Sequence, residues 1–263
     1  MRRALASVAA QTRHPVEVIV IDDCSSPDKA GDIRAIVEDF NLCIPTRLLI
    51  NESNRGANYS RNRGIFDAKG RYLAFLDSDD IWMPEKLQRQ IDEIESAKKT
   101  NGRPVLSATG RYRVNSDGAI IVRQFGGQVL NPGKIRRSNF IGTLSSVIVE
   151  TWIARHVWGF NEALPACQDW DFFIRLSDYV QYIGISDPLC VYVDHDEDRI
   201  TLNNRKRLRA ISSSTALICD HRWGNVILRL SSIAILPKTT KKLGIRTKPN
   251  DFWPSDCGSE IQE

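Results

Sequence analysis

The segment VEVIVIDDCSSPD, residues 16–28, is an apolar, β-branched run that ends in two carboxylates. This pattern is typical of a buried parallel strand whose carboxyl end meets a ligand. Ser26 is suited to cap a helix and Pro27 to occupy its first position, so a helix is expected to follow. The segment therefore predicts a strand, an acidic turn and a helix, which is the start of a β–α–β unit.

Strand and helix patterns continue to alternate downstream. The expected elements are strands at 46–51, 71–77, 104–114, 119–123 and 145–150, a hairpin turn at 115–118, and helices at 56–69, 85–98 and 168–178. This alternation predicts an α/β fold with a Rossmann-like, mostly parallel sheet flanked by helices. We expect one catalytic-type domain over residues 1–200 and a basic helical C-terminal extension over 201–263.

Composition narrows the class of protein. The chain has 263 residues, 42% of them hydrophobic and 26% charged, which is typical of an ordinary globular domain. A net charge of +4 is too small to indicate a nucleic-acid partner, and none is expected. The six cysteines include no CxxC pair, so a zinc site or a disulfide framework is not indicated. No stretch approaches the roughly 20 apolar residues of a transmembrane helix.

Acidic side chains follow two strands of the predicted sheet. Asp22 and Asp23 follow the first, and Asp77-Ser78-Asp79-Asp80 follows the strand at 71–77. Alternation along an extended segment points Asp77 and Asp79 to the same side, which suits Mg²⁺ or Mn²⁺ shared with phosphate oxygens. Acidic tripeptides also occur in turns, and Asp80 could cap the next helix. Acids at both strand ends favour a ligand site in one crevice.

In their order, these motifs resemble glycosyltransferase family 2, whose members have the GT-A fold. The matching segments are RRALASVAAQT (2–12), VEVIVIDDCSSPD (16–28), NRGANYSRNRGI (54–65), YLAFLDSDDIWMPEKL (72–87), GFNEALPACQDWDFFIRL (159–176) and DEDRITLNNRKR (196–207). The resemblance implies an enzyme that moves a sugar from a nucleotide-diphosphate sugar, by preference a UDP-sugar, to an acceptor hydroxyl. Surface polysaccharide or glycoconjugate synthesis is the expected setting.

The resemblance also implies a donor site. Asp23 matches the residue that hydrogen-bonds the nucleobase, and Arg55 and Arg61 match positions that help to hold the nucleotide. Asp77 and Ser78 are expected near the ribose and the metal. Asp79 matches the ligand of a divalent cation, Mn²⁺ or Mg²⁺, and His195 is expected either as a further metal ligand or as a solvated strand-end histidine.

Asp169 matches the family's catalytic base, although Gln168 stands where the family usually has Glu. One base and no enzymic nucleophile imply a single in-line displacement that inverts the anomeric configuration. Asp171, near the same helix start, is expected to cap the helix or to form structural bonds.

Family habit implies a cytoplasmic enzyme that acts on a glycan or lipid-linked acceptor. The basic C-terminal extension is expected either to dock on anionic lipid at the inner face of the cell membrane or to pack on the domain. Family members open with a strand resembling SVIIPTYN before the helix matched by 2–12, so we expect a start upstream of Met1. The alternatives are a truncated, catalytically silent homologue that acts as a binding module, and a sugar-phosphate nucleotidyltransferase.

Overall fold

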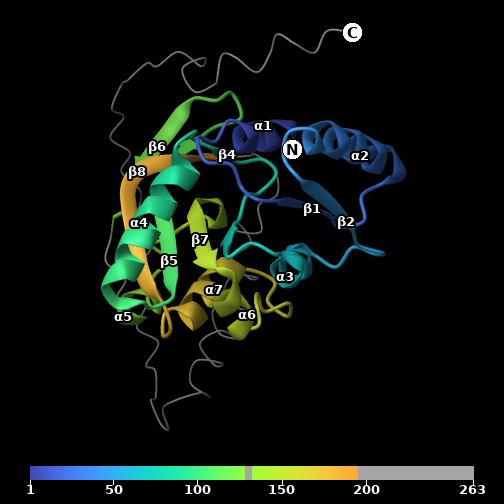
Figure 1. Ribbon diagram of the computed structural model, residues 1–263. Coiled ribbons are helices and arrows are strands. Elements are labelled where there is room, and N and C mark those ends of the chain that lie inside the picture. Colours follow the sequence, from blue (N-terminus) through green and yellow to red (C-terminus); the bar gives the residue numbers. More distant parts are fainter. Residues whose placement is uncertain (128–131, 195–263) are drawn as a thin grey trace, which may run out of the picture.

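The computed structural model describes residues 1–127 and 132–194, which form two sheets with helices around them (Figure 1). A parallel two-stranded sheet contains β1 and β2, and a six-stranded sheet has the order β3-β7-β5-β8-β4, with β6 beside β5. The strands are β1 (Val18–Asp22), β2 (Thr46–Ile50), β3 (Tyr72–Ala74), β4 (Ile81–Trp82), β5 (Val105–Val114), β6 (Ile120–Gln124), β7 (Val147–Glu150) and β8 (Gln181–Val193). The helices are α1 (Arg2–Ala9), α2 (Pro27–Asn41), α3 (Ala57–Asp67), α4 (Lys86–Asn101), α5 (Pro132–Ile135), α6 (Thr151–His156) and α7 (Gln168–Leu176).

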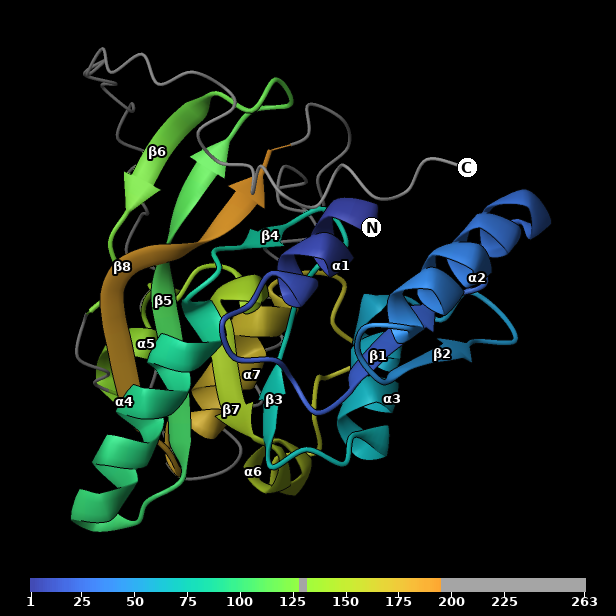
Figure 2. The same cartoon turned by 45° about the horizontal axis from the view of Figure 1, so that its top comes forward.

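The first unit forms as the sequence predicts. β1 and β2 pair in parallel from Val18 opposite Thr46 to Asp22 opposite Ile50, and α2 connects them. Ser26 is the N-cap residue of α2 and Pro27 its first residue, although the Ser26 side chain makes no capping hydrogen bond. Figure 2 shows this sheet, with α2 and α3 beside it, to one side of the six-stranded sheet.

The α/β fold expected from the sequence is confirmed, but the prediction of a mostly parallel sheet is wrong. Within the described residues, β1–β2 and β5–β8 are parallel, whereas β3–β7, β4–β8, β5–β6 and β5–β7 are antiparallel. The turn at 115–118 reverses the chain between β5 and β6, as expected. β7 then runs between β3 and β5 in the direction opposite to both.

The six-stranded sheet buries both of its faces. Leu106 and Ala108 of β5 belong to a core cluster with Phe172 and Phe173 of α7, whereas Val105 belongs to a second cluster with residues of α1 and α4. Successive side chains of a strand point to opposite faces, so these clusters lie on opposite sides of the sheet. The sheet is therefore the central layer that holds α1 and α4 on one side and α6 and α7 on the other.

Four described helices and strands escaped the sequence analysis: β4, α5, α6 and most of the 13-residue strand β8. The predicted extension 201–263, and His195 with it, lie outside the described residues. Within the described part of the chain, no helix is long and apolar enough to cross a membrane.

Candidate active site

The carboxylate of Asp23, directly after β1, organises the loop that leads into α3. Its Oδ1 accepts hydrogen bonds from the side-chain amide of Asn51 (2.8 Å) and the backbone N–H of Arg55 (2.9 Å), and its Oδ2 accepts from the N–H of Gly56 (2.7 Å). Gly56 has φ of 85°, a left-handed conformation that a glycine adopts without strain. The loop therefore turns sharply and points two backbone donors at one side chain.

These bonds keep Asp23 ionised. Burial acts to raise the pKa of Asp23, but the hydrogen bonds from Arg55, Asn51, Gly56 and Ser60 outweigh it and lower the pKa. The structure therefore holds Asp23 as an ionised hydrogen-bond acceptor of fixed orientation, which is the kind of group that the predicted contact with a nucleobase requires.

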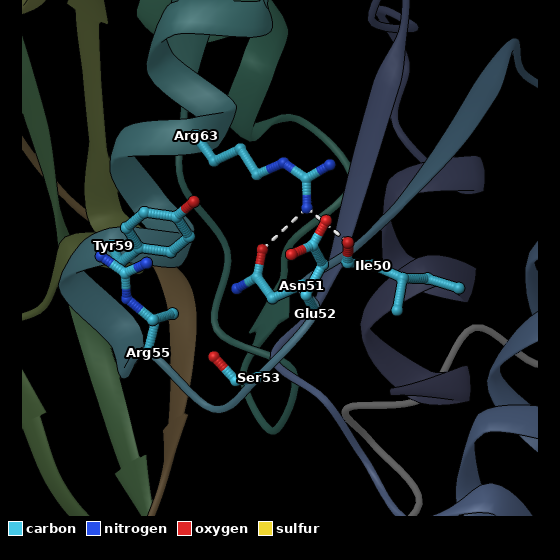
Figure 3. A pocket seen from close by; sticks show the side chains of 7 residues that line it. All are labelled: Ile50, Asn51, Glu52, Ser53, Arg55, Tyr59 and Arg63. Carbon is cyan, nitrogen blue, oxygen red and sulfur yellow. Dashed lines mark hydrogen bonds between the residues drawn. The ribbon is translucent and has the colours of Figure 1, made fainter.

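A pocket of about 290 Å³ lies between the end of β2 and α3 (Figure 3). It is lined by Ile50, Asn51, Glu52, Ser53, Arg55, Tyr59 and Arg63. The guanidinium of Arg55 stacks 4.2 Å from the centre of the Tyr59 ring, and Arg63 donates to the Asn51 side chain (2.8 Å). The pocket is therefore preorganised, and its volume is near the lower end for small-molecule sites. Of the predicted site residues, it contains Arg55.

Three other predicted residues converge from separate elements. Arg61, on α3, donates to Oδ1 of Asp77, which follows β3, at 2.9 Å. The charges of Arg61 and Asp77 both act on Asp169, in the first turn of α7. The fold thus gathers one cation and two carboxylates that lie 16 and 92 residues apart along the sequence.

Asp169 lies in a setting suited to a general base. Its Oδ1 accepts from the N–H of Trp170 (2.8 Å) and its Oδ2 from the side-chain amide of Asn139 (3.2 Å). Burial raises the pKa of Asp169, and these hydrogen bonds and the charge of Arg61 oppose the rise without cancelling it. A raised pKa makes the carboxylate a stronger proton acceptor than an ordinary aspartate.

Asp171 differs from Asp169 although it lies two residues further along the same helix. It is buried, and its Oδ2 accepts from Nε of Arg175 at 2.9 Å. This ion pair one helical turn apart gives Asp171 the structural role that the sequence predicts.

The segment Asp77–Asp80 offers a candidate position for a divalent ion. Asp79 is partly exposed and Ser78 exposed, whereas Asp80 is buried. Among the described residues, no group of three or more His, Cys, Asp and Glu side chains could hold a metal by itself. Mg²⁺ and Mn²⁺ are often held by one or two carboxylates together with substrate phosphates, so the oxygen donors of Asp79 and its neighbours fit an ion that arrives with a diphosphate.

Asp80 does not cap the following helix, which corrects that sequence prediction. The N-cap residue of α4 is Glu85. The Oδ1 of Asp80 instead accepts from the backbone N–H of Val193 at 3.2 Å, and burial raises the pKa of Asp80 to about 7. Asp80 therefore links the acidic segment to the end of β8.

Two asparagines of the site were not singled out from the sequence. Asn51 is the polar residue directly after β2, which is the same signal that drew attention to Asp22 and Asp77. Asn139 lies in a loop with no periodic pattern, and its contact with Asp169 depends on the tertiary structure.

Comparison with known proteins identifies the family. Residues 1–152 match the family model described as Glycosyl transferase family 2. The chain belongs to this family. The glycosyltransferase family 2 match spans β1 to β7 and ends at the start of α6, so Asp23, Asp77 and Asp79 lie inside it and Asp169 lies beyond it.

Curated relatives of this family 2 chain include bacterial glycosyltransferases. An uncharacterized glycosyltransferase of Haemophilus influenzae is 31% identical over 172 residues, which is 65% of this chain and 55% of that protein. The Escherichia coli protein named UDP-Glc:alpha-D-GlcNAc-diphosphoundecaprenol beta-1,3-glucosyltransferase WfgD is 32% identical over 148 residues, 56% of this chain and 54% of that one. The chain thus spans about half the length of these two relatives.

Solved structures share the family 2 chain's fold at low sequence identity. S. aureus TarS 1–349 in complex with UDP has a TM-score of 0.61 and 20% identity, covering 83% of this chain and 61% of that one. The mannosyltransferase PcManGT from Pyrobaculum calidifontis, in complex with GDP-Man and Mn²⁺, has a TM-score of 0.56 and 13% identity, covering 84% and 60%. These similarities confirm the GT-A glycosyltransferase fold.

Proposed function

We propose that the protein is a metal-dependent, inverting glycosyltransferase that moves a sugar from a UDP-sugar to a hydroxyl of a glycan or lipid-linked acceptor. The observation that carries this proposal is the convergence of Arg61, Asp77 and Asp169 at one site. The reaction needs both a charged donor site and a carboxylate base, and this cluster supplies a candidate for each.

The donor side uses groups from the first half of the chain. Asp23 would accept from the nucleobase, and Arg55, stacked on Tyr59, would lie against the nucleotide. Asp79 would hold the divalent cation, with Ser78 beside it. When bound, this ion neutralises charge that develops on the leaving diphosphate. Arg61 adds a fixed positive charge in the same region.

The acceptor side depends on Asp169. An acceptor hydroxyl that attacks the anomeric carbon must lose its proton to a group within hydrogen-bond reach. Asp169, held by Trp170 and Asn139, has a raised pKa and a fixed orientation for that task. With a single base and no enzymic nucleophile, the bond to the diphosphate breaks as the bond to the acceptor oxygen forms, and the anomeric configuration inverts.

The donor, the acceptor and the cellular location are proposed from the names of the relatives and structural neighbours. WfgD is named for a UDP-glucose donor and a diphosphoundecaprenol-linked acceptor, and a structural neighbour was crystallised with UDP. These names support a UDP-sugar donor, a lipid-linked acceptor and a role in surface polysaccharide or glycoconjugate synthesis. A lipid-linked acceptor would place the enzyme in the cytoplasm at the inner face of the cell membrane.

The test is release of nucleotide from UDP-, GDP- and dTDP-sugars with Mn²⁺ or Mg²⁺, for the wild type, Asp79→Ala and Glu93→Ala. Glu93 is an exposed acid on α4 and serves as the matched control. We expect activity with a UDP-sugar that Asp79→Ala loses and Glu93→Ala keeps. Silence toward every donor, together with no nucleotide binding by calorimetry in the presence of Mn²⁺, would refute the proposal. Nucleotide binding without turnover would favour the catalytically silent binding module.

A further inference from the structure

Ser145 lies directly behind the acidic segment, in a part of the chain that no motif marks. It belongs to a short 3₁₀ turn, Leu144–Ser146, that leads into β7, and its side chain is fully buried. It is 68 residues from Asp77 in sequence, yet the fold packs it against the segment from Asp77 to Trp82.

Ser145 binds this segment near both of its ends. Its Oγ accepts from the backbone N–H of Asp77 at 3.0 Å, and its carbonyl oxygen accepts from Nε1 of Trp82 at 2.8 Å. One buried residue therefore fixes the backbone at Asp77 and the indole at Trp82.

Further contacts make this attachment rigid. The N–H of Trp82 donates to Oγ of Ser7 on α1 at 3.1 Å, and Asp80 accepts from the N–H of Val193 on β8. Both Ser7 and Asp80 are buried, so water cannot readily replace these bonds. The stretch that contains Ser78 and Asp79 is thus held on both sides, at Asp77 and at Trp82. Ser145 makes a hydrogen bond at each of these two positions.

We propose that Ser145 is a positioning residue that holds Asp77 and Asp79 in the orientation needed for the cation and diphosphate of the donor. This inference rests on the proposed function, because it assigns Ser145 a task in the same donor site. Residues that orient metal ligands through hydrogen bonds commonly affect metal affinity as strongly as they affect activity.

Ser146 provides a matched control for the experiment. It is equally buried and belongs to the same 3₁₀ turn, but its Oγ donates to the carbonyl oxygen of Thr143 at 2.8 Å. Ser145→Ala and Ser146→Ala each remove one buried hydroxyl from this turn. A general packing defect should therefore appear in both variants, whereas a defect in presenting Asp77 and Asp79 should appear in Ser145→Ala.

The measurement is Mn²⁺ binding in the presence of UDP, by calorimetry and by the electron paramagnetic resonance signal of free Mn²⁺. We expect Ser145→Ala to weaken Mn²⁺ binding roughly 10- to 100-fold and Ser146→Ala to change it less than about threefold. Ser145→Cys keeps the space filled but has a weak donor and acceptor, so it should weaken binding in the same direction even if the alanine variant does not fold.

Each outcome has a distinct meaning. If the wild type binds neither UDP nor Mn²⁺, the proposed function fails. If the wild type binds both, and Ser145→Ala and Ser145→Cys bind as the wild type does, this inference is wrong. Equal weakening in the Ser145 and Ser146 variants would also overturn it, because the effect would then come from packing of the turn.

Discussion

Replacing Asp169 by Asn should remove catalysis and leave the donor bound. The amide matches the carboxylate in shape but cannot accept the proton of the acceptor hydroxyl. Loss of a general base slows a reaction by roughly 10²- to 10⁴-fold, which corresponds to about 3–5 kcal/mol of activation free energy. Because the donor contacts proposed for Asp23, Arg55 and Asp79 remain, the Kd for the nucleotide should change by less than about threefold.

The structure also sets the effect of this substitution on folding. Burial raises the pKa of Asp169, so the native state binds the proton more tightly than the unfolded state does. As pH rises from the ordinary titration range of an aspartate through the raised pKa, Asp169 ionises in its buried position. The free energy of unfolding therefore falls over this pH range. The Asp169→Asn variant avoids this effect at neutral pH but loses the hydrogen bond from Asn139, worth about 1 kcal/mol. Since the two changes oppose each other, Tm should move by about 4 °C or less.

Asp171→Asn is the control, because the same chemical change two residues away should lower the stability of the protein and leave catalysis intact. It breaks the buried pair with Arg175 and should lower the free energy of unfolding by about 1–3 kcal/mol. Its kcat should stay within about threefold of the wild type, since Asp171 forms its ion pair with Arg175 rather than with a residue of the site.

The assay measures sugar transfer or nucleotide release at saturating donor, together with nucleotide affinity and thermal unfolding, for both variants. An Asp169→Asn enzyme that keeps more than a tenth of the wild-type kcat would refute the reasoning. So would an Asp171→Asn enzyme that folds normally and loses activity as strongly, because Asp171 would then be the better candidate for the base.

Further predictions concern the donor site, pH and stability. Arg61→Met should weaken nucleotide binding by about 10- to 100-fold, because it removes the positive charge that Arg61 holds beside Asp77 in the proposed donor site; calorimetry that finds an unchanged Kd would contradict this. Asn139→Ala removes a donor that stabilises ionised Asp169, so the pKa of Asp169 should rise further. The acidic limb of the kcat/KM profile should then move to higher pH, and an unmoved limb would count against Asp169 as the base. Glu150→Gln breaks a buried ion pair and should lower the free energy of unfolding by about 2–4 kcal/mol in urea titrations without changing the Kd; equal stability would show that the pair is replaceable.

The sequence predicts a helix or strand well where a single uninterrupted local pattern covers that helix or strand. The run at 16–22 and the Ser26-Pro27 start of α2 depend on local patterns, and the structure confirms both. β8 was missed because Gly184 and the Ser-Asp-Pro run at 186–188 interrupt its pattern as a turn would. In the structure, irregular pairing with β5 between Thr109 and Arg111 accommodates these residues.

Strand direction and several site contacts could not be predicted in the same way. Alternation of apolar side chains shows that a strand is buried but not which way its neighbour runs, so the antiparallel pairings of β7 remained hidden. Asp23, Asp77 and Asp169 stand out because they belong to acidic motifs at element ends. Asn139 and Ser145 carry no such mark, because their roles come from contacts made across 30 and 68 residues of sequence.

The division into two sheets has a consequence for local unfolding. A two-stranded sheet is marginally stable without further packing, so the backbone amides of β1 and β2 should exchange hydrogen faster than those of β5 and β8. Arg61 reaches from α3, beside the smaller sheet, to Asp77 at the end of β3 in the larger one. A ligand that contacts Asp23 and Asp79 together would join the two sheets. Its binding free energy would then add to the free energy needed to open the two-stranded sheet, and hydrogen exchange in β1 and β2 would slow.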